Sequence, residues 1–129
     1  NHQNINFVLM PFKHGFILAA GGVIGTLIRG FINSLFPFQV HHFGWATFLI
    51  NTIGCFLIGF LWQYMQSYEQ RLFVVAGILG SFTTFSGFGM EVISYFNEKM
   101  YGPGLMYLAV SVSVGIFMVW LGQRCYSLF

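Results

Sequence analysis

The 129-residue sequence has few charged residues, and this shortage is the first guide to its class. Asp, Glu, Lys and Arg together make up only 6% of the chain, whereas hydrophobic residues make up 57%. Soluble domains average about 25% charged residues, so this chain has too few to cover its surface in water. The composition therefore predicts an all-α membrane protein with one domain over residues 1–129. The net charge of +2 is small and scattered, which argues against a nucleic-acid partner.

Residues that usually carry catalysis or bind metals are also scarce. There is no aspartate, and the three glutamates do not form a pair suited to acid–base chemistry. The two cysteines, Cys55 and Cys125, lie far apart without a CxxC motif, so we interpret both as small apolar side chains. The four histidines fall outside the expected spans, and neither a Walker motif nor a nucleophile elbow is present. We therefore expect no enzymatic activity.

Long apolar runs fill most of the chain. A membrane-spanning helix needs about 20 mostly apolar residues. Four such helices are expected, at residues 15–36, 44–64, 72–96 and 105–121. No short apolar run precedes a small-residue cleavage site, so the sequence does not predict a signal peptide. Four helices can bury one another but can scarcely enclose an ion pathway, so a transporting form is expected to be an oligomer.

The loop charges are nearly balanced across the expected membrane. With four spans both termini share one side, which then carries Lys13, Arg71 and Arg124. The other side carries Lys99, together with Arg29 if that side chain reaches the interface. This is a weak bias under the positive-inside rule. It permits insertion in both orientations.

The stretch from Gly77 to Gly89, within the third expected span, contains four glycines and four hydroxyl residues. Glycine weakens a helix by roughly 1 kcal/mol per residue relative to alanine, and Ser and Thr offer the backbone alternative hydrogen bonds. Exposed backbone at membrane depth is tolerated only where protein buries it or where it lines a wet cavity. The stretch therefore predicts a helix broken in mid-membrane and a functional site at the break.

Two features beside this stretch have two interpretations each. Asn51 lies in the middle of the second span, where it either bonds a neighbouring helix or presents a donor to a polar pathway. Phe85 and Phe88 are three residues apart and share a helix face. They form either a packing stripe or a pair of rings whose positive edges attract a small anion.

Polar residues elsewhere in the spans extend the pattern. Tyr107, Ser111 and Gly115 recur every four residues on the last helix, a spacing that is also ordinary for helix packing. A set of uncharged donors without a cation suits an anion that sheds its water, and its members are Asn51, Thr83, Thr84, Ser86, Tyr107 and Ser111.

Arg29 and Glu91 are ionisable groups in or near the membrane, where function is the first suspicion. Arg29 either serves the site or extends to the headgroups. Glu91 lies at a pore mouth or pairs with a cation as a structural tie.

Three segments together resemble the Fluc (CrcB-type) family of fluoride channels. They are residues 21–29, 47–56 and 80–88, and their order, spacing and chain length agree with that family. The resemblance implies an antiparallel, dual-topology homodimer in the bacterial inner membrane with two fluoride pores. It also implies a central structural sodium ion held by backbone carbonyls at the broken third helix.

The resemblance also implies residue roles. The carbonyls of Gly80 and Thr83 would hold sodium, Phe85 and Phe88 would line the pores, and Asn51 would donate to fluoride. Tyr107 and Ser111 match a polar track, Arg29 matches an arginine of the first helix, and Glu91 matches a family carboxylate. The sequence departs from the family at three positions, Ser81, Gly87 and Gly115.

The expected function is passive export of fluoride from the cell. One alternative is a small proton-coupled multidrug exporter, which would need a carboxylate in the first span, where this chain has none. Another is a structural subunit of a larger membrane complex, which would transport nothing alone.

Overall fold

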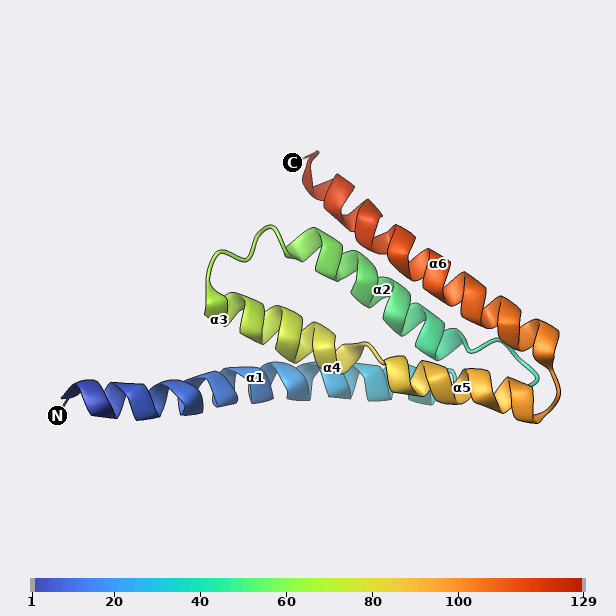
Figure 1. Ribbon diagram of the computed structural model, residues 1–129, viewed down its shortest axis with the longest axis horizontal. Helices are drawn as coiled ribbons and strands as arrows, with labels where there is room; N and C mark the ends of the chain where they lie inside the picture. The colour runs from blue at the N-terminus through green and yellow to red at the C-terminus, as the bar shows by residue number, and fades with distance from the viewer. Residues whose placement is uncertain (1, 129) are drawn as a thin grey trace.

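The computed structural model describes residues 2–128 and the side chains of residues 11–128, so the first and last residues of the expected domain lie outside it. Every regular element in this described part is helical (Figure 1). The elements are α1 (His2–Leu35), α2 (Trp45–Leu61), α3 (Tyr68–Arg71), η1 (Leu72–Leu79), α4 (Gly80–Phe82), α5 (Phe85–Asn97) and α6 (Tyr101–Tyr126).

The chain makes four antiparallel passes, with α3 to α5 forming one interrupted rod (Figure 1). Both ends of the chain and the α2–α3 loop lie toward one end of the bundle. Three segments are long and apolar enough to cross a membrane, namely Pro11–Leu35, Tyr68–Asn97 and Tyr101–Tyr126. Helix α2 is apolar but has only 17 residues. The all-α membrane fold is therefore confirmed at this level.

Five helix ends differ from those expected by three residues or more, including the start of the third pass, at Tyr68 instead of Leu72, and the end of α6, at Tyr126 instead of Leu121. Helix α1 begins at His2 instead of Gly15 and continues through Pro11, the one strong break signal in that stretch. Helix α6 begins at Tyr101 instead of Leu105, so Pro103 lies in its first turn. The first N–H groups of a helix have no helical acceptor, and proline therefore loses nothing there. Helix α2 ends at Leu61, three residues early.

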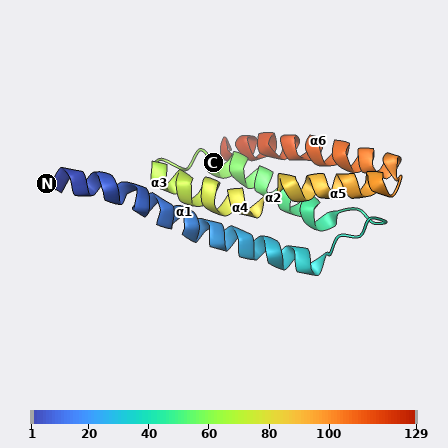
Figure 2. The ribbon, with the colours of Figure 1, turned by 60° about the horizontal axis from the view of Figure 1, so that its bottom comes forward.

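The helices pack in two groups, with α1 against η1 and α4, and α6 against α2 and α5. Helices α1 and α6 thus lie on opposite sides of the interrupted rod (Figures 1 and 2). Glycine lets α1 approach closely, because a Cβ at Gly21 or Gly25 would collide with the carbonyl oxygens of Phe73 or Ile78. Small residues commonly allow such contacts between membrane helices.

The segment before the break is a π-helix, η1, of eight residues. Such helices form i→i+5 hydrogen bonds, are rare, and occur mostly as single turns inside α-helices, often at functional sites. Its buried residues are Gly77 and Leu79, of which Gly77 lies against the backbone of α1 at Gly21. Nothing in the sequence pattern predicted this wider winding.

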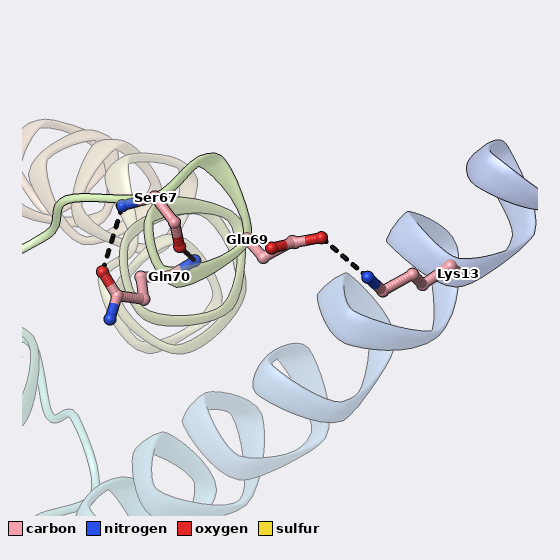
Figure 3. Close-up of polar contacts among 4 residues, drawn as sticks. All are labelled: Lys13, Ser67, Glu69 and Gln70. Atoms are coloured by element: carbon pink, nitrogen blue, oxygen red, sulfur yellow. Dashed lines mark hydrogen bonds and ion pairs between the residues drawn. The ribbon is translucent and has the colours of Figure 1, made fainter.

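A polar cluster ties α1 to α3 at the end of the bundle that holds the α2–α3 loop. Lys13 Nζ lies 2.7 Å from Glu69 Oε1, and Figure 3 shows this ion pair between the two helices. Helix α3 begins with a capping box in which Ser67 Oγ accepts from the Gln70 N–H and Gln70 Oε1 accepts from the Ser67 N–H. This reciprocal bonding satisfies donors that the helix itself cannot reach.

Candidate functional site

The helix break lies at Thr83 and Thr84, inside the stretch in which the sequence predicted it. Helix α4 ends at Phe82, and both threonines are extended, with φ −74° and ψ 155° for Thr83 and φ −145° and ψ 112° for Thr84. Helix α5 begins at Phe85. Figure 1 shows the break as a short link between α4 and α5.

The Asn51 side chain pairs with the backbone of the break. Asn51 Nδ2 donates to the Thr84 carbonyl at 3.0 Å, and Asn51 Oδ1 accepts from the Thr84 N–H at 2.8 Å. Of the two interpretations of Asn51, the hydrogen bond to a neighbouring segment is present, and the donor to a polar pathway stays a prediction. The amide carries two N–H groups, so one of them is not used by this pair.

The Thr84 side chain is the N-cap of α5. Its Oγ1 accepts from the Gly87 N–H at 3.0 Å, which is the standard use of threonine at this position. Thr84 Oγ1 also lies 3.5 Å from Ser86 Oγ. A Cβ at Gly87 would lie 3.0 Å from Thr84 Oγ1, so a larger residue at position 87 would crowd this hydroxyl.

The break leaves backbone carbonyls without their helical donors. In a continuous helix the Thr84 N–H would bond the Gly80 carbonyl and the Gly87 N–H would bond the Thr83 carbonyl. Both donors are instead taken by side chains, the first by Asn51 and the second by Thr84. Within residues 2–128 no hydrogen bond reaches the Gly80 or the Thr83 carbonyl oxygen.

The two phenylalanines that follow the break lie in different surroundings. Phe85 is 84% exposed, whereas Phe88 is only 5% exposed. Their ring centroids are 6.1 Å apart, and the Phe88 ring lies 5.3 Å from that of Tyr107. Phe88 therefore also packs in the core, while Phe85 projects from the surface of this single chain.

Glu91 accepts hydrogen bonds from two other helices. Thr47 Oγ1 on α2 donates to Glu91 Oε1 at 2.7 Å, and Tyr107 Oη on α6 donates to Glu91 Oε2. Tyr107 is fully buried, and Thr47 is nearly so. In the described part of the chain Glu91 has no cationic partner. Its contacts are with two hydroxyl groups, so it does not form the predicted structural pair with a cation.

An apolar cleft of about 430 Å³ borders the break on the side of α2 and α6. The sequence-selected residues in its wall are Asn51, Gly80, Thr83, Thr84, Phe85, Phe88 and Ser111. The hydroxyl oxygen of Ser111 is buried and, alone among the buried side-chain polar atoms described, has no hydrogen-bond partner. The cleft thus combines apolar walls with a hydroxyl that is free to donate.

A second hollow of about 430 Å³ lies between the end of α1 and the start of α5. Its polar wall consists of Arg29, Asn33, Thr47, Thr84, Ser86 and Glu91. Thr84 borders both hollows. Every site residue selected from the sequence except Tyr107 therefore lines one of the two, and Tyr107 contacts Glu91 in the second.

Two residues of the polar hollow were missed by the sequence reasoning, Asn33 and Thr47. Each lies one helical turn from a residue that was selected, Asn33 after Arg29 and Thr47 before Asn51. Residues four apart share a helix face. That spacing would have been enough to find them.

Side-chain metal ligands are not gathered anywhere in the described residues, where no group of three or more His, Cys, Asp or Glu side chains occurs. A cation at this site would therefore be held by backbone oxygens. The carbonyls of Gly80 and Thr83 are the ones whose helical donors are bound by side chains of the site.

Comparison with known proteins gives consistent results. Residues 16–123 match the family model described as CrcB-like protein, Camphor Resistance (CrcB). A protein of Desulfotalea psychrophila called fluoride-specific ion channel FluC is 38% identical over 109 residues, which cover 81% of this chain and 85% of that protein. A protein of the same name from Dehalococcoides mccartyi is 36% identical over 118 residues, covering 87% and 91% of the two chains. Another from Hydrogenovibrio crunogenus is 34% identical over 108 residues, covering 79% and 82%.

Proposed function

The chain belongs to the CrcB-like protein family, and from this membership we propose that it is a channel that lets fluoride leave the bacterial cell passively. It is a multi-pass protein of the plasma membrane, with three helices long enough to span and a shorter apolar fourth. Its relatives are named as fluoride-specific ion channels, so its activity is ion transport and not catalysis.

The observation that carries the proposal is the cleft beside the break. Fluoride is small and strongly hydrated, so a pathway must replace its water with donors. Ser111 offers a buried hydroxyl without a partner, and Asn51 retains one N–H beyond its pair with Thr84. Phe85 and Phe88 add ring edges, which are positive. None of these groups is a fixed cation that would trap the ion, which conduction requires.

The polar hollow is the proposed entry to this pathway. Arg29 and Glu91 line it together, so its charge is balanced, and Thr84 and Ser86 continue the row of hydroxyls toward the cleft. Tyr107 contributes through Glu91, because its proton is donated there. Thr84 joins the two hollows by bordering both.

The working form is proposed to be an antiparallel, dual-topology homodimer with two pores. A single chain leaves its cleft open along the break, with Phe85 84% exposed. A second copy would cover this surface and close the pathway. The near balance of Lys13, Arg71 and Arg124 against Lys99 and Arg29 supports insertion in both orientations.

A structural sodium ion is proposed at the break, bound by the carbonyls of Gly80 and Thr83. The residues present fit such an ion, since neither oxygen receives a hydrogen bond in the described part of the chain and lipid cannot supply one. Hard cations prefer oxygen ligands. The ion would coordinate these oxygens in place of the lost N–H donors and keep the break from closing into a helix.

The proposal is tested by fluoride efflux from proteoliposomes, followed with a fluoride electrode. We expect rapid efflux that needs no proton gradient and no ATP. A proton-coupled drug exporter would instead show a drug-dependent proton flux, and α1 contains no carboxylate to support one. Folded protein that moves neither fluoride nor drugs would overturn the proposal and favour a subunit of a larger complex.

A further inference from the structure

The two donors that would have closed the helix over the proposed cation site are held by two side chains. Asn51 Oδ1 binds the Thr84 N–H at 2.8 Å, which removes the donor of the Gly80 carbonyl. Thr84 Oγ1 binds the Gly87 N–H at 3.0 Å, which removes the donor of the Thr83 carbonyl. One amide and one hydroxyl thus account separately for the free oxygens of Gly80 and Thr83.

These bonds replace helical bonds one for one. A buried N–H without an acceptor is destabilising, so each side chain stabilises the open backbone by accepting from the group that the break exposes. Asn51 also donates to the Thr84 carbonyl at 3.0 Å and so fixes both backbone groups of that residue. Without these acceptors the N–H groups would return to the carbonyls of Gly80 and Thr83.

We infer that Asn51 and Thr84 are positioning residues for the cation, which hold its two carbonyl ligands open without touching it. The inference rests on the proposed sodium site and goes beyond it, because it assigns the cation's affinity to side chains of the anion pathway. Asn51 then serves both ions, with its Oδ1 toward the break and its remaining N–H toward the cleft. The occupancy of the cation site and the shape of the anion path are therefore coupled through one amide.

The test measures sodium binding without measuring transport. The full-length protein, purified in detergent in N-methylglucamine buffer, is titrated with NaCl while its thermal unfolding temperature is recorded. A ligand that binds only the folded state raises that temperature as its concentration increases. The half-saturating sodium concentration is compared among variants that elute at the same position as the wild type in size-exclusion chromatography.

Thr84→Val keeps the shape of threonine and removes the hydroxyl, while Thr84→Ser keeps the hydroxyl. Asn51→Leu removes both amide functions at similar volume. Ser94→Ala is the matched control, because it removes a hydroxyl of α5 that bonds only its own helix, at Met90 O. Loss of one hydrogen bond corresponds to roughly a tenfold change in a binding constant.

We expect the half-saturating sodium concentration to increase about tenfold in Thr84→Val and in Asn51→Leu. Thr84→Ser and Ser94→Ala should stay near the wild type. If the wild type shows no sodium-dependent shift, the sodium proposal itself fails. If the wild type responds and both Thr84→Val and Asn51→Leu respond equally well, the positioning role is wrong while the sodium site stands.

A second measurement covers the case in which Thr84→Val or Asn51→Leu does not fold. Hydrogen exchange at the Gly87 amide in the wild type should be slowed by sodium, and Thr84→Ser should preserve that protection. Fast exchange that sodium does not change would contradict the inference, since the Thr84 cap would then be absent in solution.

Discussion

The hydroxyl of Tyr107 donates a hydrogen bond to the carboxylate of Glu91, with Oη and Oε2 2.5 Å apart in the core between α5 and α6. Thr47 donates to the other oxygen of the same carboxylate at 2.7 Å. A phenol has a single proton to give. Tyr107 therefore holds Glu91 in place and does not offer its proton to an ion in the cleft.

Replacing Tyr107 with Phe should lower the stability of the fold. The change removes one of the two hydrogen bonds to the part-buried Glu91 carboxylate, and hydrogen bonds to charged groups contribute about 1.5–3 kcal/mol. Thr47→Val should have a similar effect. A double-mutant cycle on thermal unfolding should show non-additive losses, because both donors act on one carboxylate. Strictly additive losses would show that the two bonds are independent.

Asn51→Asp should reduce fluoride efflux by at least about tenfold, the effect expected from loss of one donor bond. An aspartate has no N–H to offer fluoride, repels it, and also faces the Thr84 carbonyl that Asn51 now binds. The flux assay in proteoliposomes measures this directly. The matched control is Asn97→Asp at the exposed end of α5, which should conduct normally. Wild-type flux in Asn51→Asp would refute the role of Asn51.

Phe85→Ile and Phe88→Ile should both depress fluoride flux, because each removes an aromatic edge from the cleft wall. Phe88→Ile should also lower the unfolding temperature through lost contacts within the chain. Phe88 is 5% exposed and packs against Tyr107, an aromatic contact worth about 0.5–1.5 kcal/mol beyond its buried area. Equal flux in Phe85→Ile and the wild type would exclude that ring from the pathway.

Gly25→Ala should destabilise the packing of α1, since its Cβ would collide with the Ile78 carbonyl and with Ser81 Oγ. The neighbouring Gly22→Ala is the control, because nothing lies within 4 Å of a Cβ there. Alanine is a better helix former than glycine by about 1 kcal/mol, so Gly22→Ala should match or exceed the wild type. Thermal unfolding of both variants decides the point, and equal stability of the two would contradict the close contact.

Lys13→Ala should change stability little and leave flux intact. The ion pair with Glu69 is exposed on both sides, at 63% and 46% of the side chains, so water and salt screen it. The capping box at Ser67 and Gln70 remains in the variant and still starts α3 (Figure 3). A large loss of stability in Lys13→Ala that disappears at high salt would show that the ion pair stabilises the fold despite its exposure to water.

The sequence was most informative where local chemistry decides the backbone. The glycines and hydroxyls between Gly77 and Gly89 were sufficient to predict the break, because they weaken a helix wherever they occur. It was less informative at helix ends. Pro103 was read as part of a loop, yet it lies in the first turn of α6, where its missing N–H has no consequence.

The contacts across the bundle could not be predicted from spacing. Asn51 and Thr84 are 33 residues apart, and only the packing of α2 against the break brings the amide to that backbone. Asn51 was assigned two alternatives; the fold shows the bond to a neighbouring segment, while the donor to a polar pathway stays a prediction. The π-helical winding of η1, which packs along α1, likewise has no signal in the local sequence pattern.

Helix α2 has a consequence for the lipid around the protein. Its 17 residues extend only about 26 Å at 1.5 Å per residue, less than the roughly 30 Å of a typical hydrocarbon layer. Trp45 begins the helix and Trp62 follows its last residue, each about half exposed, and such indoles favour the headgroup level. A span this short favours a locally thinner bilayer next to α2. Acyl-chain length thus becomes a variable of the channel's environment, and short-chain lipids relieve the hydrophobic mismatch that long-chain lipids impose.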